Sequence, residues 1–250
     1  MNGIFYFSST GNSLHIAEQI RAELGGEIRF IPKFKGDVNV YDKLIIVSPT
    51  HSFGLPTLVY DFIINLKSAR PLYIVLNHGG MRANAPYFAY QLCKEKGLNI
   101  RSVQDVMMPE IYTLTFSQPK WATKMVLRKA PKRIKSVIGV IKDDVEIVIP
   151  KPKKDKWTPK HLENRKIWHT LAKDFGVTEA CNNCKKCVRI CPTNNIKFRD
   201  GNIVFGDKCV ACLSCYHRCP EKAIVYLDKK KKDRYINPFI QEKNIGTDQV

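Results

Sequence analysis

The feature that most constrains this 250-residue chain is a doubled cysteine pattern in its C-terminal third. The first copy reads Cys181-x2-Cys184-x2-Cys187-x3-Cys191-Pro192, and a second copy with the same spacing begins 28 residues later. Eight of the nine cysteines belong to these copies, and the second copy supplies Cys209, Cys212, Cys215 and Cys219. Thiolates two residues apart on a tight loop can converge on one centre, so the repetition predicts two metal centres.

Two other readings of the cysteines fit the pattern less well. Pairs of the form C-x2-C also bind zinc, but a zinc site has no use for the third and fourth cysteines of each copy. Disulfides are typical of small secreted domains rather than of a chain of this size. The spacing therefore favours two iron–sulfur clusters over zinc or disulfides.

The run C-x2-C-x2-C-x3-C-P resembles that of the bacterial two-cluster ferredoxins, over roughly residues 175–228. In that family the fourth cysteine of each run ligates the other cluster. The resemblance implies a small α+β ferredoxin-like domain with two [4Fe–4S] clusters. It implies that one cluster is held by Cys181, Cys184, Cys187 and Cys219, and the other by Cys209, Cys212, Cys215 and Cys191.

The N-terminal half of the chain alternates strand-like and helix-like segments. Apolar, strand-like runs lie at 3–7, 27–31, 43–48, 71–77 and 100–108, and helical patterns follow at 14–24, 57–66 and 84–96. Strands that alternate with helices predict a parallel α/β sheet. Residues 119–142 also have helical spacing, and Pro131 predicts a break or kink that divides them into two helices. Residues 146–149 predict a short extra strand.

Three of the predicted strands end in loops rich in Ser, Thr, Gly, Asn and His, at 8–13, 49–56 and 77–81. In open α/β sheets, ligands bind beyond the carboxyl ends of the strands. The loop at 8–13 precedes a helix, whose N-terminal N–H groups together with hydroxyls and Gly11 can hold a phosphate. Ordinary helix capping is the alternative reading of the same residues.

The segment Gly3–Phe7 with Ser8-Ser9-Thr10-Gly11-Asn12-Ser13 resembles the FMN-phosphate loop of flavodoxins, [ST]-x-[ST]-G-x-[ST]. Gly54-Leu55-Pro56 and Met108-Pro109-x-x-Tyr112 are similar to that family too. The resemblance covers roughly residues 1–142 and implies a doubly wound five-stranded parallel sheet that binds FMN. Residues 8–13 would hold the phosphate, and the ring would be flanked by Thr50, His51, Ser52, Phe53, Gly54, Asn77, His78, Gly79 and Gly80. The candidates for stacking on the ring are His51, Phe53 and Tyr112.

Taken together, the chain resembles the flavodoxin–ferredoxin fusion proteins of anaerobes. We expect a flavodoxin-like domain at 1–150, a basic linker and connecting helix at 151–175, a ferredoxin domain at 176–228 and a basic polar tail at 229–250. The tail is expected to be solvated and partly disordered. The lone Cys93 lies on a helical apolar stripe and is expected to be a small core residue.

The formal net charge of +18 is concentrated rather than spread, since more than half of it falls in residues 119–175. Such a segment can attract an acidic redox partner. Nucleic-acid binding is not expected, because lysine runs are usually solvated surface and no recognised motif is present. The sequence also has no run of eighteen apolar residues and no leader pattern, which predicts a cytoplasmic protein without a membrane span. A homodimer is compatible with these features.

Three functions fit the sequence. The first is an iron–sulfur flavoprotein that transfers electrons between FMN, the clusters and a partner. The second is a flavin-dependent reductase of a small molecule, with His51, His78 or Tyr112 as proton donors. The third is a regulatory or nucleic-acid-binding protein with structural clusters. Turnover of an organic acceptor would favour the second, and salt-dependent DNA binding the third.

Overall fold

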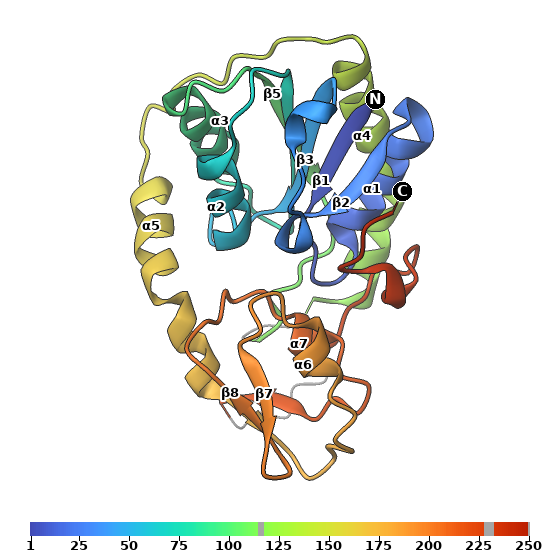
Figure 1. The fold of residues 1–250 in the computed structure, drawn as a ribbon, viewed down its shortest axis with the longest axis vertical. Helices are drawn as coiled ribbons and strands as arrows, with labels where there is room; N and C mark the ends of the chain where they lie inside the picture. The colour runs from blue at the N-terminus through green and yellow to red at the C-terminus, as the bar shows by residue number, and fades with distance from the viewer. Residues whose placement is uncertain (115–117, 228–232, 250) are drawn as a thin grey trace.

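The computed structural model describes residues 1–114, 118–227 and 233–249, which form two domains joined by a helix (Figure 1). The first domain contains a parallel sheet of five strands in the order β2-β1-β3-β4-β5. The direction of winding changes between β1 and β3, so the loops after these strands flank the switch point. The strands are β1 (Asn2–Tyr6), β2 (Glu27–Phe30), β3 (Lys43–Pro49), β4 (Leu72–His78) and β5 (Ile100–Met107). The predicted doubly wound sheet is confirmed.

Helices cover both faces of this sheet, which explains why its central strands β1, β3 and β4 are mostly apolar runs. Every residue of β4 is buried, and so are Ile4, Phe5 and Tyr6 of β1. Helices α1 (Asn12–Leu24) and α4 (Lys120–Lys142) lie on one face, and α2 (Thr57–Asn65) and α3 (Ala85–Glu95) lie on the other (Figure 1). Cys93 of α3 is fully buried, as expected of a core residue.

The prediction that Pro131 divides residues 119–142 into two helices is wrong. Helix α4 runs without interruption from Lys120 to Lys142, with Pro131 inside it. Proline removes one helical hydrogen bond, but the buried positions of α4 continue in register across it. Val126, Ala130 and Ile134 are buried at a spacing of four residues. Packing of this stripe against the sheet therefore keeps the helix continuous.

The predicted strand at 146–149 is also wrong. Only one backbone hydrogen bond joins this segment to the sheet, from Ile147 N to Arg101 O at 2.8 Å. Pro150 and Pro152 follow and have no N–H to extend a ladder. The chain instead runs over one end of the sheet from the α4 side to the α3 side, and there enters helix α5 (Trp157–Ile167) (Figure 1).

The second domain is built from two short antiparallel pairs and two short helices. The strands β6 (Phe175–Val177) and β9 (Ile224–Tyr226) form one pair, and β7 (Ile196–Arg199) and β8 (Asn202–Phe205) form the other. Helices α6 (Lys186–Ile190) and α7 (Ser214–His217) lie side by side. A 3-10 segment, Trp168–Asp174, leads into this domain from α5.

The C-terminal residues differ most from expectation. Residues 229–232 lie outside the described residues, but 233–249 are not a solvated tail: they return to the first domain and lie along it (Figure 1). Asn237, Ile240 and Ile245 are buried, and Gln249 pairs with Ile28 of β2 through two hydrogen bonds of 2.8 Å. Apolar residues at spaced positions allow this otherwise polar segment to pack.

Within the described residues, no helix is both long and apolar enough to cross a membrane.

Candidate functional site

The loop between β1 and α1 is closely packed although its side chains are polar. Ser8, Ser9, Thr10, Asn12 and Ser13 are all at most 6 % exposed. The Ser8 hydroxyl accepts a hydrogen bond of 3.0 Å from the N–H of Gly11, and α1 begins at the next residue. The first N–H groups of a helix have no partner within the helix. The loop therefore presents backbone donors and hydroxyls at a positive helix end, which suits an anion.

The side chain of Ser9 also indicates that this loop is a ligand-binding site. Its hydroxyl is buried and makes no well-formed hydrogen bond to any described residue. A buried unpaired hydroxyl is costly, so a ligand or a thiolate is the natural partner. The hydroxyl lies next to Cys212: burial raises the pKa of the Cys212 thiol to about 12, and Ser9 opposes that rise weakly.

The Asn12 side chain holds the loop in place. Its Nδ2 donates to the Pro109 carbonyl at 3.0 Å, while its Oδ1 accepts from the Tyr235 hydroxyl at 2.8 Å and from Asn237 Nδ2 at 3.0 Å. The N–H of Asn237 also donates to the Thr10 carbonyl at 2.8 Å. Asn12 thus joins the loop at 8–13 to Pro109 and to the C-terminal segment. Because its side chain is engaged in these bonds, only its backbone N–H is available to a ligand.

The conformation at Gly11 leads to a testable contrast with another glycine. Gly11 has φ of +96°, and an added Cβ would lie 3.2 Å from side-chain atoms of Asn237 and Ile240. Gly139, inside α4, has open space around its missing Cβ. Gly11→Ala should therefore lower the free energy of unfolding by roughly 1–3 kcal/mol, whereas Gly139→Ala should raise it by about 0.5–1 kcal/mol. Urea unfolding of both variants measures this, and equal effects would contradict the strained loop.

A cavity of about 570 Å³ lies between the two domains, and we call it the interdomain cavity. Its volume lies within the range of small-molecule sites. It adjoins a small hollow at the loop 8–13. Four residues line both the cavity and this hollow: Thr50, Gly79, Glu110 and Ile111. The linker contributes Trp168 and Leu171, and the second domain contributes Ala211, Leu213 and Tyr226.

Aromatic rings surround the interdomain cavity on several sides. His51 lies edge-on to Trp168, with ring centroids 5.8 Å apart, and Phe53 packs on Trp157 at 4.2 Å. Burial lowers the pKa of His51 to about 4, and nearby His161 adds to the effect. His51 is therefore neutral at pH 7, which suits a planar apolar ligand better than a charged ring would.

The eight cysteines of the doubled pattern gather around two hollows in the second domain. The first cysteine hollow is lined by Cys181, Cys184, Cys187 and Cys219. The second cysteine hollow is lined by Cys209, Cys212, Cys215 and Cys191. Each hollow thus takes three cysteines from one run and the fourth from the other. Among the described residues, no three Cys, His, Asp or Glu side chains are grouped closely enough to hold a single metal ion.

The backbone around the two hollows repeats as regularly as the sequence. Asn183 and Lys185 adopt positive φ between the cysteines of the first run, and Ala211 and Leu213 do so at equivalent positions of the second. Residues in this conformation turn successive N–H groups toward one side and create a concave site for negative charge. Among the sulfur contacts, Ala223 N donates to Cys219 Sγ at 3.3 Å and Asn195 N to Cys191 Sγ at 3.2 Å.

Arg234 lies beside both hollows and has unsatisfied donors. Its guanidinium stacks 3.3 Å from the centre of the Tyr216 ring and donates to the carbonyls of Lys222 and Ile224. Its Nε and Nη1 are buried without a hydrogen-bond partner in the described chain. Burial lowers the pKa of Arg234, while Tyr216 and the sulfurs of Cys219 and Cys215 oppose this. Negative charge held by the cysteines would offset the cost of partly burying this cation.

Comparison with known proteins now becomes informative. The model of the flavodoxin domain family matches residues 3–117. The N-terminal domain is therefore flavodoxin-like. No curated protein matches the chain.

Solved structures similar to this chain include three flavin proteins from bacteria. Flavodoxin bound to flavin mononucleotide from Fusobacterium nucleatum is 14% identical, with a TM-score of 0.41, and the match covers 58% of this chain and 98% of that one. Two-electron reduced Megasphaera elsdenii flavodoxin is 17% identical, with a TM-score of 0.40 and coverage of 55% and 98%. A Lactobacillus acidophilus flavoprotein in complex with FMN is 18% identical, with a TM-score of 0.36 and coverage of 42% and 91%.

Not all the ring-flanking residues predicted for the flavodoxin-like domain meet at the interdomain cavity. Thr50, His51, Ser52, Phe53 and Gly79 line it. Asn77 instead faces the loop at 8–13, where its Nδ2 donates to the Ser13 hydroxyl at 2.7 Å. The other three predicted residues, Gly54, His78 and Gly80, lie outside the lining of that cavity.

Physical causes account for these three positions. An added Cβ on Gly54 would lie 2.5 Å from the His161 ring, so Gly54 allows α5 to approach. The His78 ring is turned toward Asp105, at 3.3 Å. Gly80 lines another cavity, next to α4.

Sequence reasoning missed several residues around the interdomain cavity, chiefly Trp168, Tyr226 and Glu110. Nothing in the local pattern of the linker or the second domain indicates that these residues face the flavodoxin-like domain, because that depends on how the domains pack. Tyr112, one of the three predicted ring-stacking candidates, does line the cavity.

Proposed function

We propose that this protein is an electron-transfer flavoprotein that binds FMN and two [4Fe–4S] clusters. Bound FMN would supply one- or two-electron chemistry, and each cluster would supply one-electron chemistry. The family match of residues 3–117 and the anion-binding character of the loop at 8–13 support the flavin. Residues 8–13 would hold its phosphate, and the interdomain cavity has room for its ring.

The cysteine hollows support the clusters. Each hollow has four cysteines and backbone N–H groups aimed at sulfur, and nearby Arg234 has two nitrogen atoms, Nε and Nη1, without a hydrogen-bond partner in the described chain. Cluster-bound thiolates are negative and accept such hydrogen bonds. Four cysteines in each hollow, drawn from both runs, match the ligand sets that the ferredoxin resemblance implies.

The observation that carries the proposal is the position of Leu213. Leu213 lines both the interdomain cavity and the second cysteine hollow, so one side chain separates the proposed flavin site from the proposed cluster site. Ser9 makes a similar link, since it belongs to the phosphate loop and lies next to Cys212. Cofactors held at this separation would exchange electrons without any domain movement.

The basic segment 119–175 would receive the electron-transfer partner. Lys124, Arg128, Lys132 and Lys135 are exposed along α4. A cationic face of this kind accelerates encounter with an acidic protein and does so less at high salt. We therefore propose an acidic redox protein as the partner.

Purification without oxygen tests the cofactor content. We expect FMN and about eight iron atoms per chain, because two four-iron clusters would be present. The absorbance spectrum, extracted flavin, and iron and sulfide contents measure this. Zinc in place of iron, or iron without flavin in the fully loaded protein, would contradict the proposal.

Arg234 gives a further prediction about both clusters. Removing a positive charge near a cluster stabilises its oxidised, less negative state, so Arg234→Gln should lower both midpoint potentials. A neighbouring unit charge changes such a potential by tens of millivolts at an effective dielectric of about 20, and we expect a shift on the order of 50 mV. Redox titration followed by electron paramagnetic resonance measures it.

Arg199→Gln is the matched control for Arg234→Gln. Arg199 carries the same charge in the same domain but is exposed to solvent, where water and salt screen it. Its replacement should leave both potentials nearly unchanged. Equal shifts in the two variants would show that Arg234 acts only through the net charge of the protein. Its position near the cysteine hollows would then have no effect on the midpoint potentials.

A further inference from the structure

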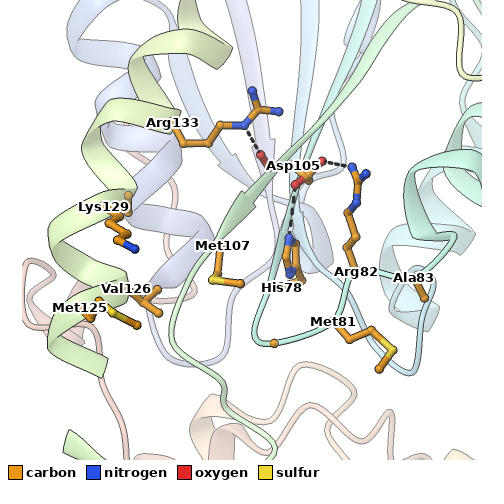
Figure 2. A pocket seen from close by; sticks show the side chains of 12 residues that line it. His78, Met81, Arg82, Ala83, Asp105, Met107, Met125, Val126, Lys129 and Arg133 are labelled. Carbon is orange, nitrogen blue, oxygen red and sulfur yellow. Dashed lines mark hydrogen bonds and ion pairs between the residues drawn. The ribbon is translucent and has the colours of Figure 1, made fainter. Parts of the chain in front are cut away.

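A second large cavity, of about 670 Å³, lies at the edge of the sheet and has no role in the function proposed above. We call it the edge cavity. It is enclosed by the end of β5, the first half of α4 and the loop at 79–83, as Figure 2 shows. Met81 lines both the edge cavity and the interdomain cavity, so only the loop that carries Met81 separates them.

One end of the edge cavity is cationic. Asp105 is paired there with Arg82 at 2.6 Å and with His78 at 3.3 Å, and Arg133 Nε donates to the Asp105 carbonyl at 2.8 Å (Figure 2). Hydrogen bonding from His78, helped by Arg82, lowers the pKa of Asp105 to about 2, so this carboxylate stays ionised. Among the described residues that line the cavity, Asp105 is the one acid.

The cations in the edge cavity outnumber the acid. Arg82, Arg133 and Lys129 together exceed Asp105 by two positive charges. Lys129 has no hydrogen bond, ion pair or ring contact with any described residue. A lysine without a partner at the wall of a cavity can bind an anion without first breaking an internal contact, which suits a carboxylate.

The other end of the edge cavity is apolar. Met81, Met107 and Met125 are 56 %, 45 % and 38 % exposed, although large apolar side chains usually avoid water in such groups. Val126 and Ala130 complete this wall. Methionine side chains are flexible and polarizable, and they adapt to the shape of an apolar ligand.

We infer that the edge cavity is a binding site for a small organic acid, with its carboxylate near Lys129 and its apolar body on the three methionines. A volume of this size holds a ligand with an apolar chain or ring in addition to the acid group. The site differs from the hollow at the loop 8–13, which contains none of the three methionines and no lysine or arginine, although His78 lines both. The binding itself does not depend on the proposed cofactors.

Calorimetric titration of the full-length, cofactor-loaded protein tests this inference. The probes are octanoate and trans-cinnamate, each compared with its neutral amide, at pH 7 and low salt. We expect saturable binding of the two acids and binding about tenfold weaker for the amides, because an amide lacks the negative charge that would pair with Lys129. Absence of saturable binding of both acids at millimolar concentration would overturn the inference.

Two lysine variants separate the site from general basicity. Lys129→Gln should lower the affinity for the two acids about tenfold and leave the affinity for the amides unchanged. Lys132→Gln, on the same helix but outside the cavity lining, should change neither. Equal losses in both variants would overturn the specific site.

Two further measurements complete the test. Met107→Glu should abolish binding of the acids, because a carboxylate then occupies the apolar wall. Binding of an acidic ferredoxin that depends on Lys129, with no binding of the small acids, would make this face a protein-docking surface and overturn the inference. Because flavin and iron contents are measured separately, failure here is distinguishable from failure of the proposed function.

Discussion

Cys219→Ala is expected to remove one cluster and leave the other. Cys219 lines the first cysteine hollow with Cys181, Cys184 and Cys187, although it belongs to the second run of the sequence. If the proposed clusters occupy the hollows, the variant should lose about half of its iron. The lost signal in electron paramagnetic resonance should be the one that Cys184→Ala also removes.

The reciprocal variant provides the control. Cys191 belongs to the first run but lines the second cysteine hollow with Cys209, Cys212 and Cys215. Cys191→Ala should therefore remove the signal that Cys219→Ala retains. If Cys219→Ala instead removed the cluster that depends on Cys209, the crossed arrangement of ligands would be wrong.

A chain that ends at Arg234 is expected to lose much of its stability and most of its affinity for flavin. It would lack the buried side chains of Ile240 and Ile245, each contributing roughly 1.5–3 kcal/mol, and the hydrogen bonds of Asn237. A loss of about 5 kcal/mol lowers the melting temperature by about 10–20 °C in a protein of this size. Thermal unfolding without oxygen and titration with FMN measure the two effects.

A single substitution tests the same contact more finely. Asn237→Ala leaves the buried Asn12 Oδ1 with only the Tyr235 hydroxyl as donor, which should cost about 1–3 kcal/mol and weaken FMN binding. Gln241→Ala, at an exposed position of the same segment, should change stability by less than about 0.5 kcal/mol. A melting temperature unchanged by both substitutions and by the truncation would mean that this segment does not support the loop at 8–13.

Much of the fold could be predicted because its signals are local. Strands β1 to β5 lie within one or two residues of their expected places, since β1, β3 and β4 are buried along most of their length and the edge strands β2 and β5 still carry buried apolar residues. The cysteine spacing likewise predicted that the first three cysteines of each run would gather, because a short loop allows few arrangements, whereas the exchange of the fourth was implied by the ferredoxin resemblance. The loop at 8–13 was found for the same reason: a strand, a hydroxyl-rich turn and a helix follow each other directly.

The remaining features depend on contacts between distant parts of the chain. Pro131 indicates a break only if the packing of α4 against the sheet is ignored. Trp168 and Tyr226 line the interdomain cavity because of how the domains meet, and Arg234 reaches Tyr216 because the C-terminal segment folds back. No local pattern marks these positions. The edge cavity was missed for the same reason, since its methionines come from a loop, a strand and a helix.

The return of residues 233–249 to the loop at 8–13 has a consequence for biosynthesis. The ribosome makes residues 8–13 long before Asn237, so a nascent chain lacks this support until the segment 233–249 has emerged. The cysteine-rich domain emerges between the two. If the proposed cofactors bind, iron can be inserted as soon as the cysteine-rich domain has emerged, whereas tight binding of the flavin waits for residues 233–249.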